Sequence, residues 1–114
     1  MGMKALYCAN EQGKFWEARA LIMNNAGYEL MNTTVKNDKT QSQTIANFLK
    51  SAVDPAFMKS CLDSGKYDAR LQSDQELATS LGIQGTPDFY INTTNFPGAY
   101  SYTDMQSAVD SALK

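Results

Sequence analysis

The chain has 114 residues, and its 10 basic and 12 acidic side chains give a formal net charge of −2. This balance, with no run of Lys or Arg, argues against nucleic-acid or anionic-membrane partners. The longest apolar stretches fall far short of the ~20 residues of a membrane-spanning helix, and no signal-peptide pattern opens the chain, so no membrane insertion is expected.

The histidine and cysteine content excludes several classes of catalytic and metal site. Histidine is absent, which excludes Ser-His-Asp and Cys-His catalysis and zinc sites built on imidazole. The two cysteines, Cys8 and Cys61, cannot form a four-cysteine metal site, and their spacing fits no zinc, haem or iron–sulfur motif. We therefore expect no metal site and no cofactor in this chain.

The first forty residues are predicted to form two helices and a loop. The apolar pattern indicates a helix from about residue 5 to Gly13, where a glycine can take the left-handed conformation that ends a helix. A second pattern indicates a helix from Phe15 to about Asn24. Residues 28–39 are mostly polar and are predicted to be a loop.

The strongest helical signal lies in the middle of the chain. Five apolar residues recur at the spacing of one helix face: Ile45, Phe48, Leu49, Ala52 and Val53. Asp54 can then cap a new helix, Pro55 fits its first position, and Gly65 can end it. Residues 67–81 predict a further helix, with a capping pattern over residues 73–76 if it is broken there.

The pattern changes after Gly85. Residues 89–91 predict a short strand, 92–95 a turn, and 96–99 the returning strand of a hairpin. Ser101 or Thr103 can cap a final helix whose apolar face includes Met105 and Val109. The resulting fold class is α+β and mainly helical. Periodicity also places most of five aromatic side chains in the predicted core, the alternative being a substrate-binding aromatic surface: Phe15, Trp16, Tyr67, Phe89 and Tyr90.

Three blocks of this sequence carry a resemblance to a known family. They are residues 8–17, residues 57–67, and residues 81–92 with the Gly-Thr-Pro segment, followed by Gly98 and the final helix. In this order and spacing they resemble the DsbA-like thiol-disulfide oxidoreductases, whose thioredoxin fold carries a helical insertion. The resemblance implies an incomplete thioredoxin-like fold, with a helical insertion domain over residues 4–81 and a β-β-α part over residues 82–114.

The chain departs from the family at the redox centre. Family members carry a Cys-x-x-Cys motif before the helical insertion, and this chain has none. The resemblance therefore implies a C-terminal fragment that holds no catalytic residue and is inactive alone. Position 88 is Asp where the family more often has a small hydroxyl residue, and a carboxylate close to a thiolate would raise the pKa of that thiol.

The resemblance also names a substrate site. It implies that Gly85, Thr86 and Pro87 bind the backbone of an extended substrate, with a cis peptide bond before Pro87. The alternative, from the residues alone, is a trans proline that only ends a helix.

For the two cysteines, two interpretations stay open. Cys8 and Cys61 both lie on apolar helix faces, as buried free thiols do. The resemblance implies instead a structural disulfide between the first and fourth helices, because some relatives have a cysteine pair at similar positions. A periplasmic or secreted location, implied for the parent protein, permits such a bond.

The implied function is that of a thiol-disulfide oxidoreductase acting on protein or peptide substrates with thiols or disulfides. Two alternatives remain: a glutathione-dependent isomerase or transferase on the same scaffold, and a non-catalytic helical interaction module. A two-stranded hairpin with an uncovered apolar face also predicts a homodimer through that surface.

Overall fold

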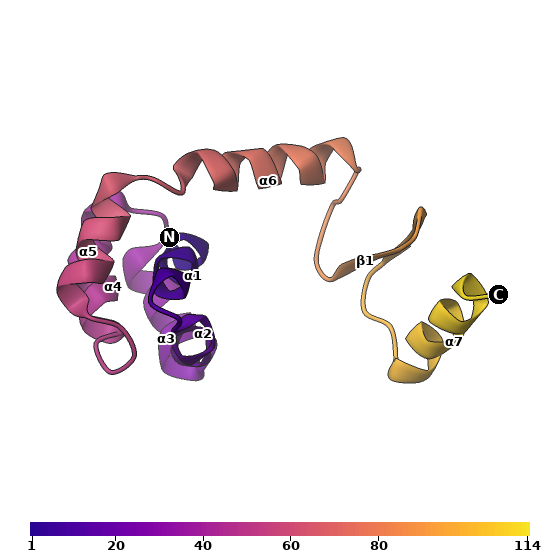
Figure 1. Cartoon of the computed structure of the whole chain (residues 1–114), viewed down its shortest axis with the longest axis horizontal. Helices are drawn as coiled ribbons and strands as arrows, with labels where there is room; N and C mark the ends of the chain where they lie inside the picture. The colour runs from indigo at the N-terminus through magenta and orange to yellow at the C-terminus, as the bar shows by residue number, and fades with distance from the viewer. The chain divides into compact units, whose positions relative to one another are not determined.

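A computed structural model describes residues 1–114 of the chain. The elements, in chain order, are α1 (Gly2–Glu11), α2 (Phe15–Ile22), α3 (Asn25–Glu29), the π-helical segment η1 (Leu30–Val35), the 3-10 turn η2 (Lys39–Gln41), α4 (Ser42–Phe48), α5 (Pro55–Ser64), α6 (Asp68–Ser80), β1 (Asp88–Ile91), β2 (Thr94–Pro97) and α7 (Tyr102–Ala112) (Figure 1). The predicted α+β, mainly helical fold class is confirmed.

The chain forms two compact units, residues 1–72 and 73–114, and the boundary lies inside the continuous helix α6. The break that the capping pattern allowed within this helix does not occur. The predicted division at residues 81 and 82 into an insertion domain and a β-β-α part stays a prediction. None of the helices combines the length and the apolar character that a bilayer crossing requires.

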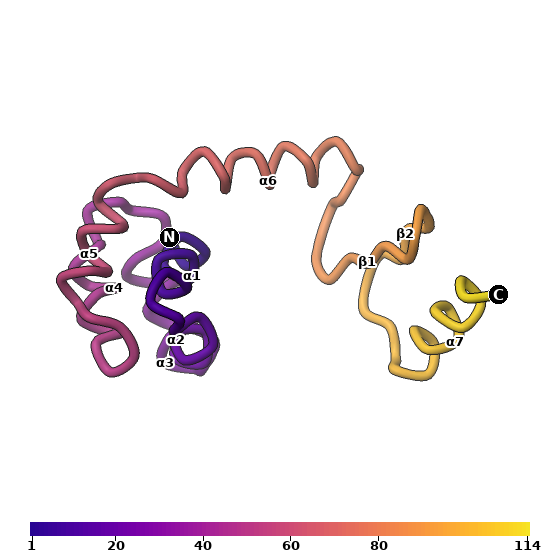
Figure 2. The backbone as a smooth tube through the Cα atoms, in the orientation of Figure 1, coloured from indigo at the N-terminus to yellow at the C-terminus, as the bar shows by residue number.

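The first unit is a group of helices around one apolar core. α5 packs against α4 and α1, and α1 also packs against α2, as the backbone trace in Figure 2 shows. The largest side chains without solvent contact come from α1, η1, α4, α5 and the turn after α4: Cys8, Val35, Ile45, Leu49 and Met58. The core therefore joins segments that are distant in sequence.

The predicted limits of α5 are confirmed. The Asp54 carboxylate accepts a hydrogen bond from the Phe57 backbone N–H, at 3.1 Å, and Pro55 occupies the first turn. Gly65 ends the helix in the left-handed conformation, with φ of 66°. These local groups satisfy backbone donors and acceptors that the helix itself leaves free.

The predicted loop over residues 28–39 is wrong for residues 28–35, because α3 and η1 make residues 25–35 helical, and it holds for residues 36–38. Asn24 caps this stretch by accepting a hydrogen bond of 2.8 Å from the Gly27 N–H. Val35 is fully buried, and Leu30 and Met31 pack against the core. Core contact at these few positions stabilises a helix whose remaining residues are mostly polar or small, so the apolar pattern is too weak to recognise in the sequence.

The apolar stripe of residues 45–53 correctly indicates burial but not the end of the helix. α4 ends at Phe48, and a turn follows in which the Val53 N–H donates to the Leu49 carbonyl at 2.9 Å. Leu49 and Val53 stay buried. The turn thus keeps both side chains on the core after the helix has ended.

An ion-pair cluster connects α1, η2 and the first turn of α6. The carboxylate of Asp68 lies 2.6 Å from Lys4 Nζ and 2.7 Å from Lys39 Nζ. The hydrogen bond from Lys39, the larger contribution, and the hydrogen bond from Lys4 lower the pKa of Asp68 to about 2. The charged form of this carboxylate is therefore favoured in the folded unit.

The second unit contains the antiparallel hairpin and α7, which packs against β1. β1 and β2 are joined by a two-residue turn at Asn92 and Thr93. This turn is shorter than the predicted turn over residues 92–95, and the returning strand therefore begins at Thr94. Asn92 has φ of 55°. Asparagine tolerates this conformation better than most residues, which permits the tight turn.

The predicted burial of the aromatic residues is wrong in part. Trp16 is 72% exposed, and Phe89 and Tyr90 are also exposed, whereas Phe15 and Tyr67 are half-buried. The second unit has no fully buried side chain at all. A hairpin and one helix cannot cover all of their apolar faces, so residues with a buried periodicity stay in contact with water.

Candidate functional site

The predicted substrate segment follows α6 directly. α6 ends where the Gly82 N–H donates to the Thr79 carbonyl and the Ile83 N–H donates to the Ala78 carbonyl, each at 3.0 Å. Gly82 has φ of 73°, so the three features together form a Schellman motif. This motif directs the chain out of the helix and into the segment before β1.

Thr86 and Pro87 lie at the entry to β1. The Thr86–Pro87 peptide bond is cis. The Pro87 carbonyl accepts a hydrogen bond of 3.0 Å from the Gly98 N–H, just after β2, and the strand register places Asp88 opposite Pro97. The segment is therefore attached to the open end of the hairpin.

A hollow of about 350 Å³ lies between this segment and the end of the hairpin. One side is formed by the predicted substrate-binding residues, all exposed: Gly85, Thr86 and Pro87. The facing side is formed by residues that sequence reasoning did not assign to a site: Asn95, Pro97 and Gly98. The register of the hairpin is the signal that could have found them, because strand pairing opposite residue 88 brings residues 95–98 to this end.

The backbone of Thr86 is available to a ligand. No hydrogen bond inside the chain uses the Thr86 backbone N–H or carbonyl, and the residue is exposed. An exposed N–H and carbonyl next to a strand can pair with an extended peptide in the way that another strand would. The hollow therefore combines unpaired backbone groups with room for side chains.

One acidic side chain lines the hollow. Asn95 Nδ2 donates a hydrogen bond to the Asp88 carboxylate and a longer one, of 3.3 Å, to the Phe89 carbonyl. These bonds keep the Asp88 carboxylate at the wall of the hollow. A thiol brought into this space would have its pKa raised by the neighbouring negative charge.

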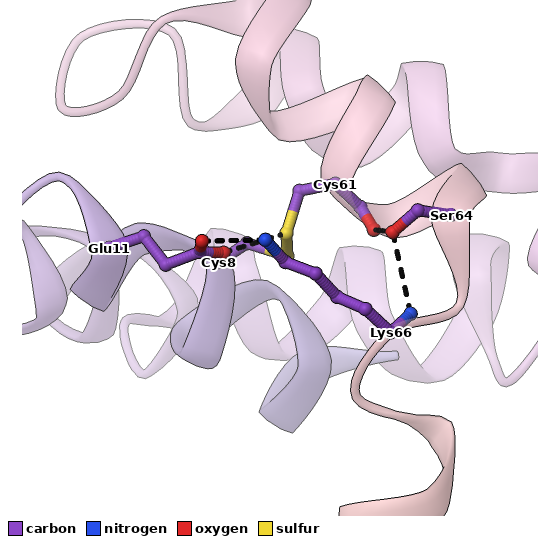
Figure 3. The surroundings of a disulfide bond; sticks show 5 residues. All are labelled: Cys8, Glu11, Cys61, Ser64 and Lys66. Atoms are coloured by element: carbon purple, nitrogen blue, oxygen red, sulfur yellow. Dashed lines mark hydrogen bonds and ion pairs between the residues drawn. A yellow bond between two sulfur atoms is a disulfide. The ribbon is translucent and has the colours of Figure 1, made fainter.

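The two cysteines form a disulfide between α1 and α5. The Cα atoms of Cys8 and Cys61 are 6.0 Å apart, in the usual range for such a bond. Cys8 is fully buried and Cys61 is 6% exposed. Neither sulfur therefore presents a thiolate to a substrate, and the bond connects two core helices of the first unit (Figure 3).

An ion pair lies beside this disulfide. Glu11 Oε1 accepts a hydrogen bond of 2.6 Å from Lys66 Nζ, and Glu11 Oε2 lies 3.3 Å from Cys61 Sγ (Figure 3). The hydrogen bond from Lys66 lowers the pKa of Glu11, and the same bond raises the pKa of Lys66. The Cys61 sulfur is thus next to a carboxylate that stays charged, which disfavours a thiolate at this position.

One cluster has three side chains of metal-ligating type. Ligand atoms of Cys8, Glu11 and Cys61 lie within 4.8 Å of one another. Two of these atoms are the sulfurs of the disulfide, and a metal would need them as thiolates. The oxidised pair therefore does not offer a metal site.

Comparison with known proteins places both regions within one family match. A family model described as thioredoxin matches residues 1–111. No curated protein and no solved structure matches the chain. The matched range includes the disulfide of the first unit and the hollow of the second.

Proposed function

The chain belongs to the thioredoxin family, and we propose on this basis that it is part of a DsbA-like thiol-disulfide oxidoreductase acting on disulfides in proteins. In this proposal Gly85, Thr86 and Pro87 form the substrate groove. The observation that carries the proposal is the exposed and unpaired backbone of Thr86 beside the hollow. An extended substrate would hydrogen-bond to this N–H and carbonyl as an added strand.

The thiol chemistry requires a redox pair other than Cys8 and Cys61, because those two sulfurs are buried and bonded to each other. In the proposed reaction a thiolate from such a pair attacks one sulfur of the substrate disulfide. The substrate S–S bond breaks, a mixed disulfide forms, and the leaving sulfur takes up a proton. A second thiolate then attacks the mixed disulfide, which releases the reduced substrate and leaves the pair oxidised.

A peptide titration followed by NMR tests the groove. The probe is a short extended peptide with one S-methylated cysteine at its centre, which excludes exchange with the protein. We expect the largest amide shifts at Gly85, Thr86 and Gly98. The control is the same peptide N-methylated at the central residue. It cannot donate the hydrogen bond that the Thr86 carbonyl would accept, so it should bind more weakly.

The opposite result would remove the basis of the groove. Shifts confined to the first unit, or equal binding of the two peptides, would refute backbone pairing at Thr86. A second test is turnover: the chain alone should not accelerate the reduction of insulin disulfides by a dithiol. Robust turnover would contradict a purely structural role for Cys8 and Cys61.

We also propose that the parent protein works in the periplasm or outside the cell, since a disulfide between two core helices persists in oxidising compartments. Cell fractionation of the tagged natural protein tests this. Recovery in the cytosol, with both cysteines free to react with a thiol label after unfolding, would overturn it.

The apolar surface of the second unit supports self-association through a homodimer. Several of its large apolar side chains are exposed: Leu77, Leu81, Phe89, Tyr90, Val109 and Leu113. A second copy could cover this surface, which would remove apolar area from water. Sedimentation analysis at increasing concentration tests the proposal, and a monomeric mass at high concentration would count against it.

A further inference from the structure

One concave surface of the first unit is formed by aromatic and cationic side chains. We call it the aromatic–cation cluster and define it by side chains of α1, α2, the start of α6 and the turn before α6: Tyr7, Phe15, Trp16, Arg19, Tyr67 and Arg70. The rings of Tyr7 and Tyr67 are stacked with centroids 5.2 Å apart. Phe15 and Trp16 meet edge to face, with centroids 5.0 Å apart.

Two arginines lie over the rings of this cluster. Arg70 Cζ is 4.5 Å from the centroid of the Tyr7 ring, and Arg19 Cζ is 6.0 Å from that of Trp16. Both distances fall within the range of cation–π interaction. The rings thus hold each guanidinium group near the surface, where its N–H groups can reach a ligand.

A hollow of about 400 Å³ adjoins the cluster, and Arg19 and Tyr67 are the two cluster residues that do not line it. Tyr7 and Asn10 of α1 line it, together with Gly13, the first turn of α2 and Arg70. Trp16, in that first turn, is 72% exposed. An exposed tryptophan leaves a large apolar surface in water, and a ligand that covers it would recover the free energy of burial.

We propose that the aromatic–cation cluster binds a peptide segment of a partner protein that carries a carboxylate beside an aromatic side chain. The aromatic side chain of the peptide would enter the hollow against Phe15 and Trp16, and its carboxylate would pair with Arg70 or Arg19. Trp, Tyr and Arg are the residues most enriched among those that dominate binding energy in protein interfaces. This site is independent of the groove at Thr86.

Charge and form favour a peptide over other anionic partners. The chain has a net charge of −2, which opposes nucleic acid and anionic lipid, since both interact with the field of the whole molecule. A carboxylate on a short segment needs only the local arginines. The surface is also hollowed, so it can enclose one side chain, whereas a lipid surface would contact only its rim.

Fluorescence gives a direct test, because Trp16 is the only tryptophan of the chain. The probe is the blocked peptide Gly-Asp-Phe-Asp-Gly, titrated into the intact oxidised chain. We expect a saturable blue shift of the Trp16 emission. The affinity of the matched peptide Gly-Asn-Phe-Asn-Gly should be lower than that of the Asp peptide by a factor of about five or more, because it cannot form the charge-assisted hydrogen bonds.

Variants locate the binding on the protein. Arg70→Gln and Trp16→Ala should each weaken binding about tenfold, as truncation of a central interface residue does; NMR shifts replace fluorescence for the tryptophan variant. The matched control is Tyr102→Ala, which removes a different exposed aromatic ring, 83% exposed, in the second unit. Circular dichroism of each variant checks that the helices are retained.

Any one of the following outcomes would overturn the proposal. The first is no change in emission up to millimolar peptide. The second is equal affinity for the Asp and Asn peptides, or equal losses in Arg70→Gln and Tyr102→Ala. The third is a larger blue shift with anionic phosphatidylglycerol vesicles than with the peptide, which would assign the surface to lipid.

Discussion

Reduction of the disulfide between Cys8 and Cys61 opens a cross-link whose ends are 53 residues apart in sequence. On the chain-entropy model, closing a loop of this length restricts the unfolded chain by an amount equivalent to about 4 kcal/mol at 25 °C. The reduced thiols occupy nearly the same buried positions and pack as small apolar groups. We therefore expect the free energy of unfolding of the first unit to fall by about 4 kcal/mol.

Urea unfolding of the oxidised and phosphine-reduced chain measures this loss. Trp16 fluorescence reports on the first unit alone, because this unit contains the only tryptophan. With a slope of about 1 to 2 kcal/mol per molar urea, the midpoint should fall by about 2 M or more. A chain that starts with only a few kcal/mol of stability would be unfolded without urea once reduced.

The double variant Cys8→Ala with Cys61→Ala separates the cross-link from packing. Its stability should not respond to the reductant, and it should be less stable than the reduced natural chain because its methyl groups leave space where the sulfurs were. A loss below about 1 kcal/mol on reduction would refute the loop-entropy reasoning. A loss seen only in the double variant would assign the effect to packing instead.

Three further predictions concern the stability of the first unit. The pKa of Asp68 is lowered from 3.8 to about 2 by its two lysine partners, so this stabilisation is complete above the unfolded pKa and is lost as pH falls from about 4 to about 2. Urea midpoints should decline over this window, and Asp68→Asn should remove that part of the decline; an unchanged profile would contradict the ion pairs. Gly27→Ala directs a Cβ into backbone carbonyls of α2 and should cost more than about 2 kcal/mol in thermal unfolding. Gly2→Ala, whose nearest neighbour lies at 3.4 Å, is the tolerated control, and equal effects would argue against the clash. Asp54→Ala removes the cap of α5 and should cost about 1 kcal/mol, whereas Asp54→Ser should retain most of the stability; no difference between them would show that the cap contributes little.

Local hydrogen bonds made several elements readable from the sequence. Asp54 and Gly65 limit α5 through contacts with residues three positions away. Ser101 likewise caps α7 by accepting a hydrogen bond of 3.1 Å from the Asp104 N–H. Such bonds depend only on neighbouring residues, so the residue types are sufficient to predict them.

The candidate site was predicted on one side only. Gly85, Thr86 and Pro87 were identified from a contiguous motif, and they do line one hollow. Asn95 and Gly98 complete it only because β2 returns antiparallel to β1 in a register set by the two-residue turn. A motif describes one segment, whereas a hollow needs a second segment whose position depends on pairing.

By itself, the sequence determined both ends of α5, the start of α7 and the existence of the hairpin, because each arises from contacts between near neighbours. The tertiary structure decided between free thiols and a disulfide for Cys8 and Cys61, and it alone decided that residues 25–35 are helical and that Trp16 stays in water. These three outcomes depend on which surfaces other segments cover. Periodicity states that a side chain is apolar, but only packing decides whether a partner is present to bury it.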